Sequence, residues 1–281
     1  MRILTGAALG AFGLLASVAS AQAQDAEFNG AYVGASLGKS FQGNDGGETI
    51  QFDRDLNGSF GDTVVTSAAD APNAFSPGFC GGAAVAATNV GCSNDRDGTQ
   101  YAARVGYDIQ RGNFVVGLVG EIGKNQVNDS VSAYSTTPAS YTMTRSIDWN
   151  AGARLRAGYA VGGRTLAYAT GGGAYAKVDH GFATTNTANS FAVTSESKDA
   201  WGWAAGGGIE QKVGRNFSVG IEYLYTRLND DDYTVRAGAL TSPATPATNP
   251  FLLGNAGGTD LRRADNRFDM HGVRATAAFR F

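Results

Sequence analysis

The last nine residues, VRATAAFRF (residues 273–281), alternate apolar and polar side chains, and this alternation constrains the fold more than any other feature of the sequence. The odd-numbered positions are apolar and end on Phe281, whereas the even-numbered positions include Arg274, Thr276 and Arg280. Because successive side chains of a β-strand point to opposite faces, the segment is predicted to be a strand with one apolar and one charged face. Such a strand fits a soluble sheet that covers a core, or a transmembrane barrel with lipid outside and a polar lumen inside.

The first 23 residues have the three parts of a secretory signal peptide. A short basic start at Met1 and Arg2 precedes the apolar run ILTGAALGAFGLLASVA, and the small residues of ASAQAQ offer cleavage sites after Ala21 or Ala23. The alternative is an uncleaved membrane anchor, but the glycines of the run and its A-x-A ending favour removal. We therefore predict a signal peptide over residues 1–23 and one exported domain over residues 24–281.

Composition narrows the class of protein further. After the signal peptide, no apolar run reaches the length of about 18 residues that a transmembrane helix requires. The mean hydropathy of −0.17 does not argue against a barrel, because only half of the positions in a barrel strand face lipid. The net charge of −3 implies no extended basic surface, so no nucleic-acid partner is expected.

Three tight turns separate pairs of alternating runs. They are RGN at 111–113, GGR at 162–164 and GRN at 214–216, and each predicts a β-hairpin. The paired runs are 101–110 with 114–124, 147–161 with 165–178, and 201–213 with 217–228. GAYVGASLGKSF (residues 30–41) and the C-terminal run add one strand each, so we predict eight strands.

The connections between these hairpins are much longer than the turns. Residues 43–96, 128–143, 183–198 and 236–264 are polar, and we read all four as loops. Long and short connections therefore alternate strictly along the chain. This asymmetry is typical of a transmembrane barrel with short periplasmic turns and long extracellular loops, and a soluble sandwich has no reason to sort its connections in this way.

Charges are sorted by parity along the predicted strands. On run 147–161, for example, the odd positions from Ile147 to Tyr159 carry no charge and are predicted to face lipid, where Arg or Lys at mid-depth costs about 2–4 kcal/mol. The opposite parity is predicted to form a charge network in the lumen. Its members are Arg104, Asp108, Glu121, Asp148, Arg154, Arg156, Lys177, Asp179, Glu210, Lys212, Glu222, Arg274 and Arg280. Arg145, Arg227 and Arg267 break the parity near the outer strand ends, where lipid headgroup phosphates are expected to meet them.

Aromatic residues are predicted to form two girdles, one at each membrane interface. The girdle near the short turns comprises Tyr107, Phe114, Tyr159, Tyr168, Phe217, Phe279 and Phe281. The girdle near the loops comprises Tyr101, Trp201, Trp203, Tyr223 and Tyr225.

The signal peptide, the eight alternating runs, YVGASLG in the first strand and the terminal Phe281 together resemble the opacity-type, OmpA-like family of small porin-like outer-membrane barrels of Gram-negative bacteria. The resemblance covers essentially the whole exported chain and implies an all-β, eight-stranded antiparallel barrel in the bacterial outer membrane. It assigns Phe281 as the signal read by the barrel assembly machinery. It also implies contact with outer-membrane lipid and lipopolysaccharide, and a surface ligand or host partner that the sequence does not name.

The lumen charges support two readings. Eight strands enclose an interior that side chains can fill, so paired charges are expected to plug it. The alternative, which the porin label of the family suggests, is a low-conductance gated channel lined by Arg104, Glu121, Arg154 and Glu222. We favour a structural barrel that displays its surface loops for interaction.

The loops contain the other candidates. Cys80 and Cys92 are predicted to form a disulfide that constrains a short loop of an exported chain. In DRDLNG, the residues Asp53, Asp55 and Asn57 have the spacing of half a calcium loop, but Val64 stands where the closing Glu is required, so we predict no metal site and keep these residues as weak candidates. Exposed apolar residues of NPFLLG are predicted either to bind a partner or to pack against other loops, and packing is favoured.

Catalysis and cofactors find little support in the sequence. The chain has two histidines, His180 and His271, and no serine stands beside His271. GLVGEIGK fails the spacing of a phosphate-binding loop. We therefore predict that the protein is not an enzyme and needs no cofactor.

Overall fold

The computed structural model describes residues 28–43, 47–194, 197–230, 233–240 and 247–281. The predicted signal peptide, residues 1–23, lies outside the described residues. No helix in these described ranges is both long enough and apolar enough to cross a membrane.

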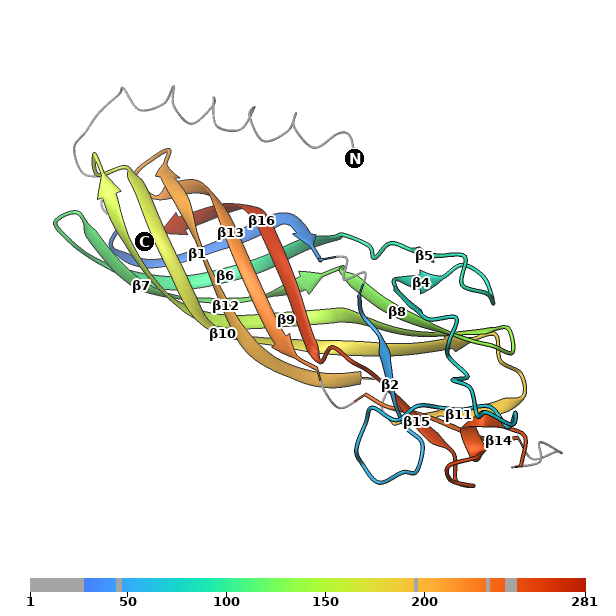
Figure 1. The fold of residues 1–281 in the computed structure, drawn as a ribbon. Helices are drawn as coiled ribbons and strands as arrows, with labels where there is room; N and C mark the ends of the chain where they lie inside the picture. The colour runs from blue at the N-terminus through green and yellow to red at the C-terminus, as the bar shows by residue number, and fades with distance from the viewer. Residues whose placement is uncertain (1–27, 44–46, 195–196, 231–232, 241–246) are drawn as a thin grey trace.

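Eight antiparallel strands close into a barrel, which confirms the predicted fold (Figure 1). The strands are β1 (Gly30–Phe41), β6 (Gly98–Arg111), β7 (Phe114–Asn125), β9 (Ala139–Val161), β10 (Thr165–Thr184), β12 (Ser197–Lys212), β13 (Phe217–Asn229) and β16 (Arg267–Arg280). Each pairs with its neighbour in the chain, and β16 closes the ring against β1, with Arg280 opposite Tyr32 and His271 opposite Phe41. The closing contact explains why the alternation of the last nine residues is so strict, because Arg274 and Arg280 point into the lumen while Val273 and Phe279 are exposed outside.

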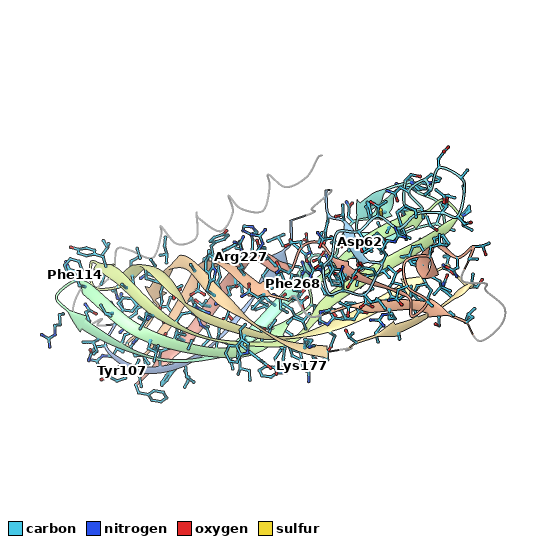
Figure 2. All side chains as sticks on the ribbon, turned by 60° about the horizontal axis from the view of Figure 1, so that its bottom comes forward. Asp62, Tyr107, Phe114, Lys177, Arg227 and Phe268 are labelled. Carbon is cyan, nitrogen blue, oxygen red and sulfur yellow. A yellow bond between two sulfur atoms is a disulfide. The ribbon has the colours of Figure 1, made fainter. Side chains whose placement is uncertain are left out.

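The three short turns lie at one end of the barrel. Gly112 has φ +58°, Gly162 has φ +58° and Gly163 has φ +70°, a backbone region that residues with a Cβ rarely adopt. Glycine at these positions therefore allows the strands to reverse within a few residues. Tyr107 and Phe114 lie near this end and point outward, and the Phe114 side chain is 68% exposed in the isolated chain (Figure 2).

A β-bulge on β9 reverses the parity of that strand. The register places Lys177 opposite Trp149 but the next residue, Val178, opposite Ile147, so Asp148 is the extra residue. Below the bulge, Trp149 to Tyr159 alternate as predicted. Above it, Ile147 and Arg145 point inward and are buried, so the predictions that Ile147 faces lipid and that Arg145 meets lipid headgroups are wrong.

Two of the segments read as loops continue the barrel wall. β8 (Asn128–Ser135) follows β7 in the same direction and pairs with the first part of β9, which begins at Ala139 instead of 147. β10 likewise runs on to Thr184 against Tyr141. Figure 1 shows these strands extending well beyond β1, β6 and β16, so the wall is much taller on one side.

The remaining connections fold over this extension. A four-stranded sheet joins β2 (Ile50–Asp53), β15 (Thr259–Arg263), β14 (Val235–Ala239) and β11 (Asn189–Val193), which come from the first, third and fourth connections. We call the described parts of residues 47–97, 126–146, 180–194 and 230–266 the loop domain. Its core contains Phe52, Phe75, Tyr141, Met143 and Phe251 among other buried residues. Phe251 and Leu252 of the 3₁₀-helix Pro250–Leu252 are buried there, so the NPFLLG segment packs against other loops.

A disulfide joins Cys80 and Cys92 on the outer face of the extended wall. It links β3 (Phe79–Gly81), which pairs with β8, to β5 (Cys92–Ser93), which pairs with β4 (Ala83–Ala84). The bridge therefore holds a small hairpin against the β8–β9 ribbon.

Candidate functional site: a closed lumen beneath the loop domain

Two layers of ion pairs cross the middle of the lumen. In the upper layer, Glu121 accepts two bonds from Arg154, with Nη1–Oε1 and Nη2–Oε2 both 2.9 Å, and a third from Arg274 Nη1 at 3.0 Å. Glu222 lies beside it, bonds to Arg274 and accepts from Arg104 Nη2 at 2.9 Å. The side chain of Glu222 is 0% exposed and that of Arg154 is 2% exposed, so this layer is closed to bulk solvent.

The lower layer lies nearer the short turns. Arg156 bonds to Asp108, and its Nη1 lies 2.8 Å from Oε2 of Glu210. Arg280, from the closing strand, places Nη2 2.7 Å from Oδ2 of Asp108. Both guanidinium groups stack on the ring of Tyr32, at 4.9 and 4.8 Å from its centroid. Each cation therefore has both a carboxylate and an aromatic partner.

Apolar side chains close the lumen above and below these ion pairs. On the short-turn side lie Phe28, Val115, Ala160, Leu166 and Tyr168. On the loop side lie Val127, Ile147, Ala174, Ala176, Val178, Ala200, Ala204, Leu224, Leu228, Phe268 and Met270. The cavity between the upper ion pairs and this second apolar layer measures about 30 Å³, comparable with the volume of one water molecule.

The structure brings most of the predicted lumen charges together. Arg104, Asp108, Glu121, Arg154, Arg156, Glu210, Glu222, Arg274 and Arg280 form the two layers described above. Lys212 also points inward, with Nζ 5.3 Å from the centroid of Phe28. Tyr168, which was assigned to the girdle, instead donates from its hydroxyl to Glu222 at 2.7 Å inside the barrel.

Three predicted lumen charges lie outside the barrel. Asp148 is the bulged residue and pairs with the exposed Lys124 at 3.3 Å on the outer surface. Lys177 and Asp179 have the outward parity of β10, since Ala176 and Val178 are the buried positions, and Figure 2 shows Lys177 pointing away from the wall. The prediction assigned the wrong parity to this strand because its glycines and alanines give little contrast between faces.

Arg227 and Arg267 were predicted to lie outside the lumen, and they do. Arg227 pairs with Asp269 at 2.6 Å, and Arg267 pairs with Asp265 at 3.5 Å.

A second buried charge cluster joins the base of the loop domain, and we call it the clasp. Asp129 accepts from Arg145 Nε at 2.6 Å and lies 2.9 Å from Arg263 Nη2, and Arg263 also holds Glu48 at 2.7 Å. Asp230 bonds to Nε2 of His180 at 2.8 Å and lies 3.6 Å from Arg145. All four long connections, or the strand ends that they join, contribute to the clasp. The sequence gives no local signal for it, because its members are far apart in the chain.

The clasp shifts the ionisation of its carboxyl groups. Burial raises the pKa of Glu48 to about 7, against the opposing charge of Arg263. Burial also acts to raise the pKa of Asp129, but Arg263 and Arg145 outweigh it and hold this pKa below its usual value. Beside them, burial and the charge of Asp129 raise the pKa of Asp95 to about 6.

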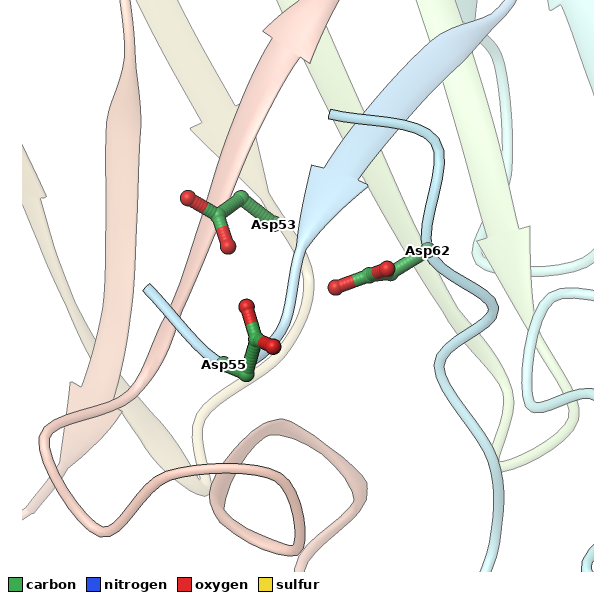
Figure 3. A group of neighbouring side chains, drawn as sticks. All are labelled: Asp53, Asp55 and Asp62. Carbon is green, nitrogen blue, oxygen red and sulfur yellow. The ribbon is translucent and has the colours of Figure 1, made fainter. Parts of the chain in front are cut away.

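The weak cation candidate forms a compact acidic group in the first connection, in which Asp53 is buried, Asp55 is exposed and Asp62 is half-buried. Ligand oxygens of Asp53, Asp55 and Asp62 lie within 4.8 Å of one another (Figure 3). Asp53 accepts the backbone N–H groups of Asn57 and Gly58 at 3.1 and 2.8 Å, and the Asn57 amide donates to Asp55 at 2.9 Å. The carboxylates thus shape the turn, and a cation there stays an untested alternative.

A family model described as outer membrane protein beta-barrel domain matches residues 11–241. An eight-stranded antiparallel barrel with an apolar outer face and a charged interior has the architecture of such proteins. The chain belongs to this family, and it is a protein of the bacterial outer membrane. A comparison with curated proteins found no match.

Several solved structures are distantly similar to the chain. OprG from Pseudomonas aeruginosa is 12% identical, with a TM-score of 0.49 over 92% of this chain and 99% of that one. Ail of Yersinia pestis, the attachment invasion locus protein, is 11% identical, with a TM-score of 0.36 over 90% of this chain and 100% of that one. The outer membrane protease OmpT from Escherichia coli is 8% identical, with a TM-score of 0.38 over 90% of this chain and 97% of that one. These similarities are too distant to carry a functional argument.

Proposed function

We propose that the protein is a non-conducting outer-membrane anchor that presents its loop domain at the cell surface for binding. The observation that carries the proposal is the interior of the barrel, in which two layers of ion pairs lie between two apolar layers. An ion that crossed this interior would have to break buried arginine–carboxylate pairs and then enter an apolar layer. Both steps are costly, because each leaves charge without water or a partner.

The loop domain supports the second half of the proposal. Its core draws buried residues from the first, second and fourth long connections, and the partly buried Phe182 and Phe191 of the third pack against them. The clasp joins all four connections through ion pairs. A folded surface of this kind fixes the positions of its exposed residues, which lowers the conformational entropy lost on binding. A barrel whose loops served only to close the strand ends would not need a shared core.

We further propose that outer-membrane lipid and lipopolysaccharide surround the apolar band, and that the barrel assembly machinery reads Phe281. The exposed outer residues include Leu37, Val105, Leu118 and Leu155. Phe281 is 71% exposed and contacts the ring of Phe279, so its side chain is available outside the closed barrel. The proposal assigns no catalytic role.

Current through a planar bilayer tests the proposal. Refolded protein, shown to be folded by circular dichroism and by a heat-dependent shift in electrophoretic mobility, is expected to insert and remain silent. Glu121→Ala is the lumen variant, and Lys124→Ala, which changes an exposed pair, is its matched control. Discrete current steps in the wild type that change in Glu121→Ala but not in Lys124→Ala would overturn the proposal in favour of the low-conductance channel.

A further inference from the structure

A cavity of about 380 Å³ lies at the far end of the loop domain. The turn at 135–139 between β8 and β9, the turn at 185–189 after β10 and residues 248–251 of the last connection line it, and Ala74 of the first connection completes it. Its volume falls within the range of about 300–1,000 Å³ that is usual for ligand pockets. All four long connections meet at this one site.

The lining has a consistent chemistry. Its polar side chains are hydroxyl and amide groups, including those of Thr136, Thr137, Thr187 and Asn186, and the aromatic rings of Tyr141 and Phe251 lie at its buried side. Among the described residues, no Asp, Glu, Lys, Arg or His lines the cavity. Hydroxyl and amide groups both donate and accept hydrogen bonds, whereas a charged ligand would lose water here without gaining an opposite charge. The site therefore favours a neutral ligand that carries many hydroxyl groups.

One side chain in the cavity has an unused donor. Asn249 is 9% exposed, and its Oδ1 accepts the backbone N–H of Phe251 at 3.1 Å, which fixes the orientation of the amide. No described residue accepts a hydrogen bond from its Nδ2 in the structure. Solvent reaches this amide, so the donor is available to a ligand oxygen in the cavity.

We infer that this cavity binds a neutral saccharide, with Asn249 Nδ2 donating to a sugar oxygen and the threonine hydroxyls bonding at the rim. This inference rests on the proposed surface-binding function and names the ligand class and the site. The saccharide would come either from the polysaccharide of the cell's own lipopolysaccharide or from the surface of another cell. Both sources present the same chemistry to the cavity.

Binding of the purified full-length protein in detergent micelles to a glycan microarray tests the inference. The array carries neutral, sialylated and sulfated oligosaccharides, together with the O-polysaccharide isolated from the producing bacterium. We expect binding to neutral glycans and none to charged ones. A signal confined to the bacterium's own O-polysaccharide supports a ligand in the same membrane, whereas a signal on other neutral glycans supports recognition of another cell.

Two variants locate the binding. Asn249→Asp keeps the acceptor that caps the 3₁₀-helix but removes the donor and adds a negative charge, so the Kd should rise about tenfold or more. Asn94→Asp makes the same change at an exposed position outside the cavity and should leave the Kd unchanged. The double variant Thr137→Val and Thr187→Val removes two exposed hydroxyls at constant shape and should weaken binding several-fold.

Folded protein that binds no neutral glycan, or that binds one equally well in Asn249→Asp, would overturn the inference. The proposed function fails separately, because only current steps in the bilayer experiment contradict the closed anchor. A silent barrel without glycan binding would therefore leave the anchor standing and exclude the saccharide.

Discussion

Arg145 lies directly opposite Asp129 where the β8–β9 ribbon leaves the barrel, and Arg145 Nε is 2.6 Å from Asp129 Oδ2. Asp129 also bonds to Arg263 of the last connection, which in turn holds Glu48 of the first. One buried carboxylate thus links the tall side of the wall to the two longest connections. We therefore expect the loop domain to depend on this buried contact more than on an exposed ion pair.

Asp129→Asn is expected to loosen the loop domain and leave the barrel intact. The substitution keeps the shape but removes the carboxylate that Arg145 and Arg263 share, which leaves Arg145 only the longer ion pair with Asp230 and Arg263 only the ion pair with Glu48. Breaking a buried ion pair by removing one partner costs about 3–5 kcal/mol. Hydrogen exchange followed by mass spectrometry should show lost protection in β8 and β15 and unchanged protection in β12 and β13. Asp97→Asn, at an exposed position, serves as the control. Equal protection in both variants would show that the clasp does not hold the domain.

The loop domain is expected to become more stable as the pH falls from 8 to 5. The pKa of Glu48 is raised from 4.5 to about 7 and that of Asp95 from 3.8 to about 6, while both groups return to ordinary values in the unfolded chain. Between about pH 4 and pH 7 the folded domain therefore binds more protons than the unfolded one, so its stability falls as pH rises. The fall is up to about 1.4 kcal/mol per unit of pKa shift for Glu48, and it is smaller for the half-buried Asp95, whose charge solvent screens. The lowered pKa values of Asp129 and Asp230 act in the opposite direction only below about pH 4.

Glu48→Gln isolates the main titrating group. The variant removes the larger of the two raised pKa values, so resistance of the loop domain to protease should vary much less between pH 8 and pH 5 than in the wild type. Asp62→Asn, in the acidic turn of the same connection, is the matched control and should retain the wild-type pH dependence. A pH dependence that is equally steep in Glu48→Gln would show that Glu48 is not its source.

In the lumen, Glu222→Gln is expected to destabilise the whole barrel by about 3–5 kcal/mol, because Arg104 and Arg274 lose their shared, fully buried carboxylate. Asp148→Asn breaks the exposed pair with Lys124 and should cost about 0–1 kcal/mol. Urea unfolding in micelles, followed by tryptophan fluorescence, compares the two variants. If their midpoints coincided, the lumen ion pairs would not stabilise the barrel.

The barrel was predictable because its signals are local. Alternation shows which residues face outward, and the three tight turns mark the hairpins, so the eight strands follow from the sequence. The bulge was not predictable, since one extra residue such as Asp148 leaves the composition of the strand unchanged while it reverses every side chain beyond it.

The wall extension was missed because both of its faces are covered. Ser132 and Thr142 lie on the outer face of β8 and β9 and bond to each other at 2.8 Å, and Ser132 also accepts the backbone N–H of Ala84 at 2.9 Å. A serine- and threonine-rich strand of this kind has the composition of a loop. Its strand character depends on the disulfide-bonded segment that packs on it, which no local pattern shows.

Phe281→Ala is expected to lower the yield of assembled protein in cells without changing the stability of the refolded barrel. The backbone N–H of Phe281 donates to the carbonyl of Ala31 at 3.0 Å, a bond that alanine retains, while the exposed ring contributes only its edge contact with Phe279. Removing the ring should therefore cost the folded state about 1 kcal/mol or less. The amount of protein in outer-membrane fractions from cells measures assembly, and urea unfolding of refolded protein measures stability, so the two effects can be separated.

Phe279→Ala is the control. It removes the neighbouring outward ring but keeps the terminal one, so it should assemble at close to the wild-type yield. If Phe281→Ala assembled normally, the terminal aromatic would not be an assembly signal, and its exposed ring would be one more lipid contact at the short-turn end.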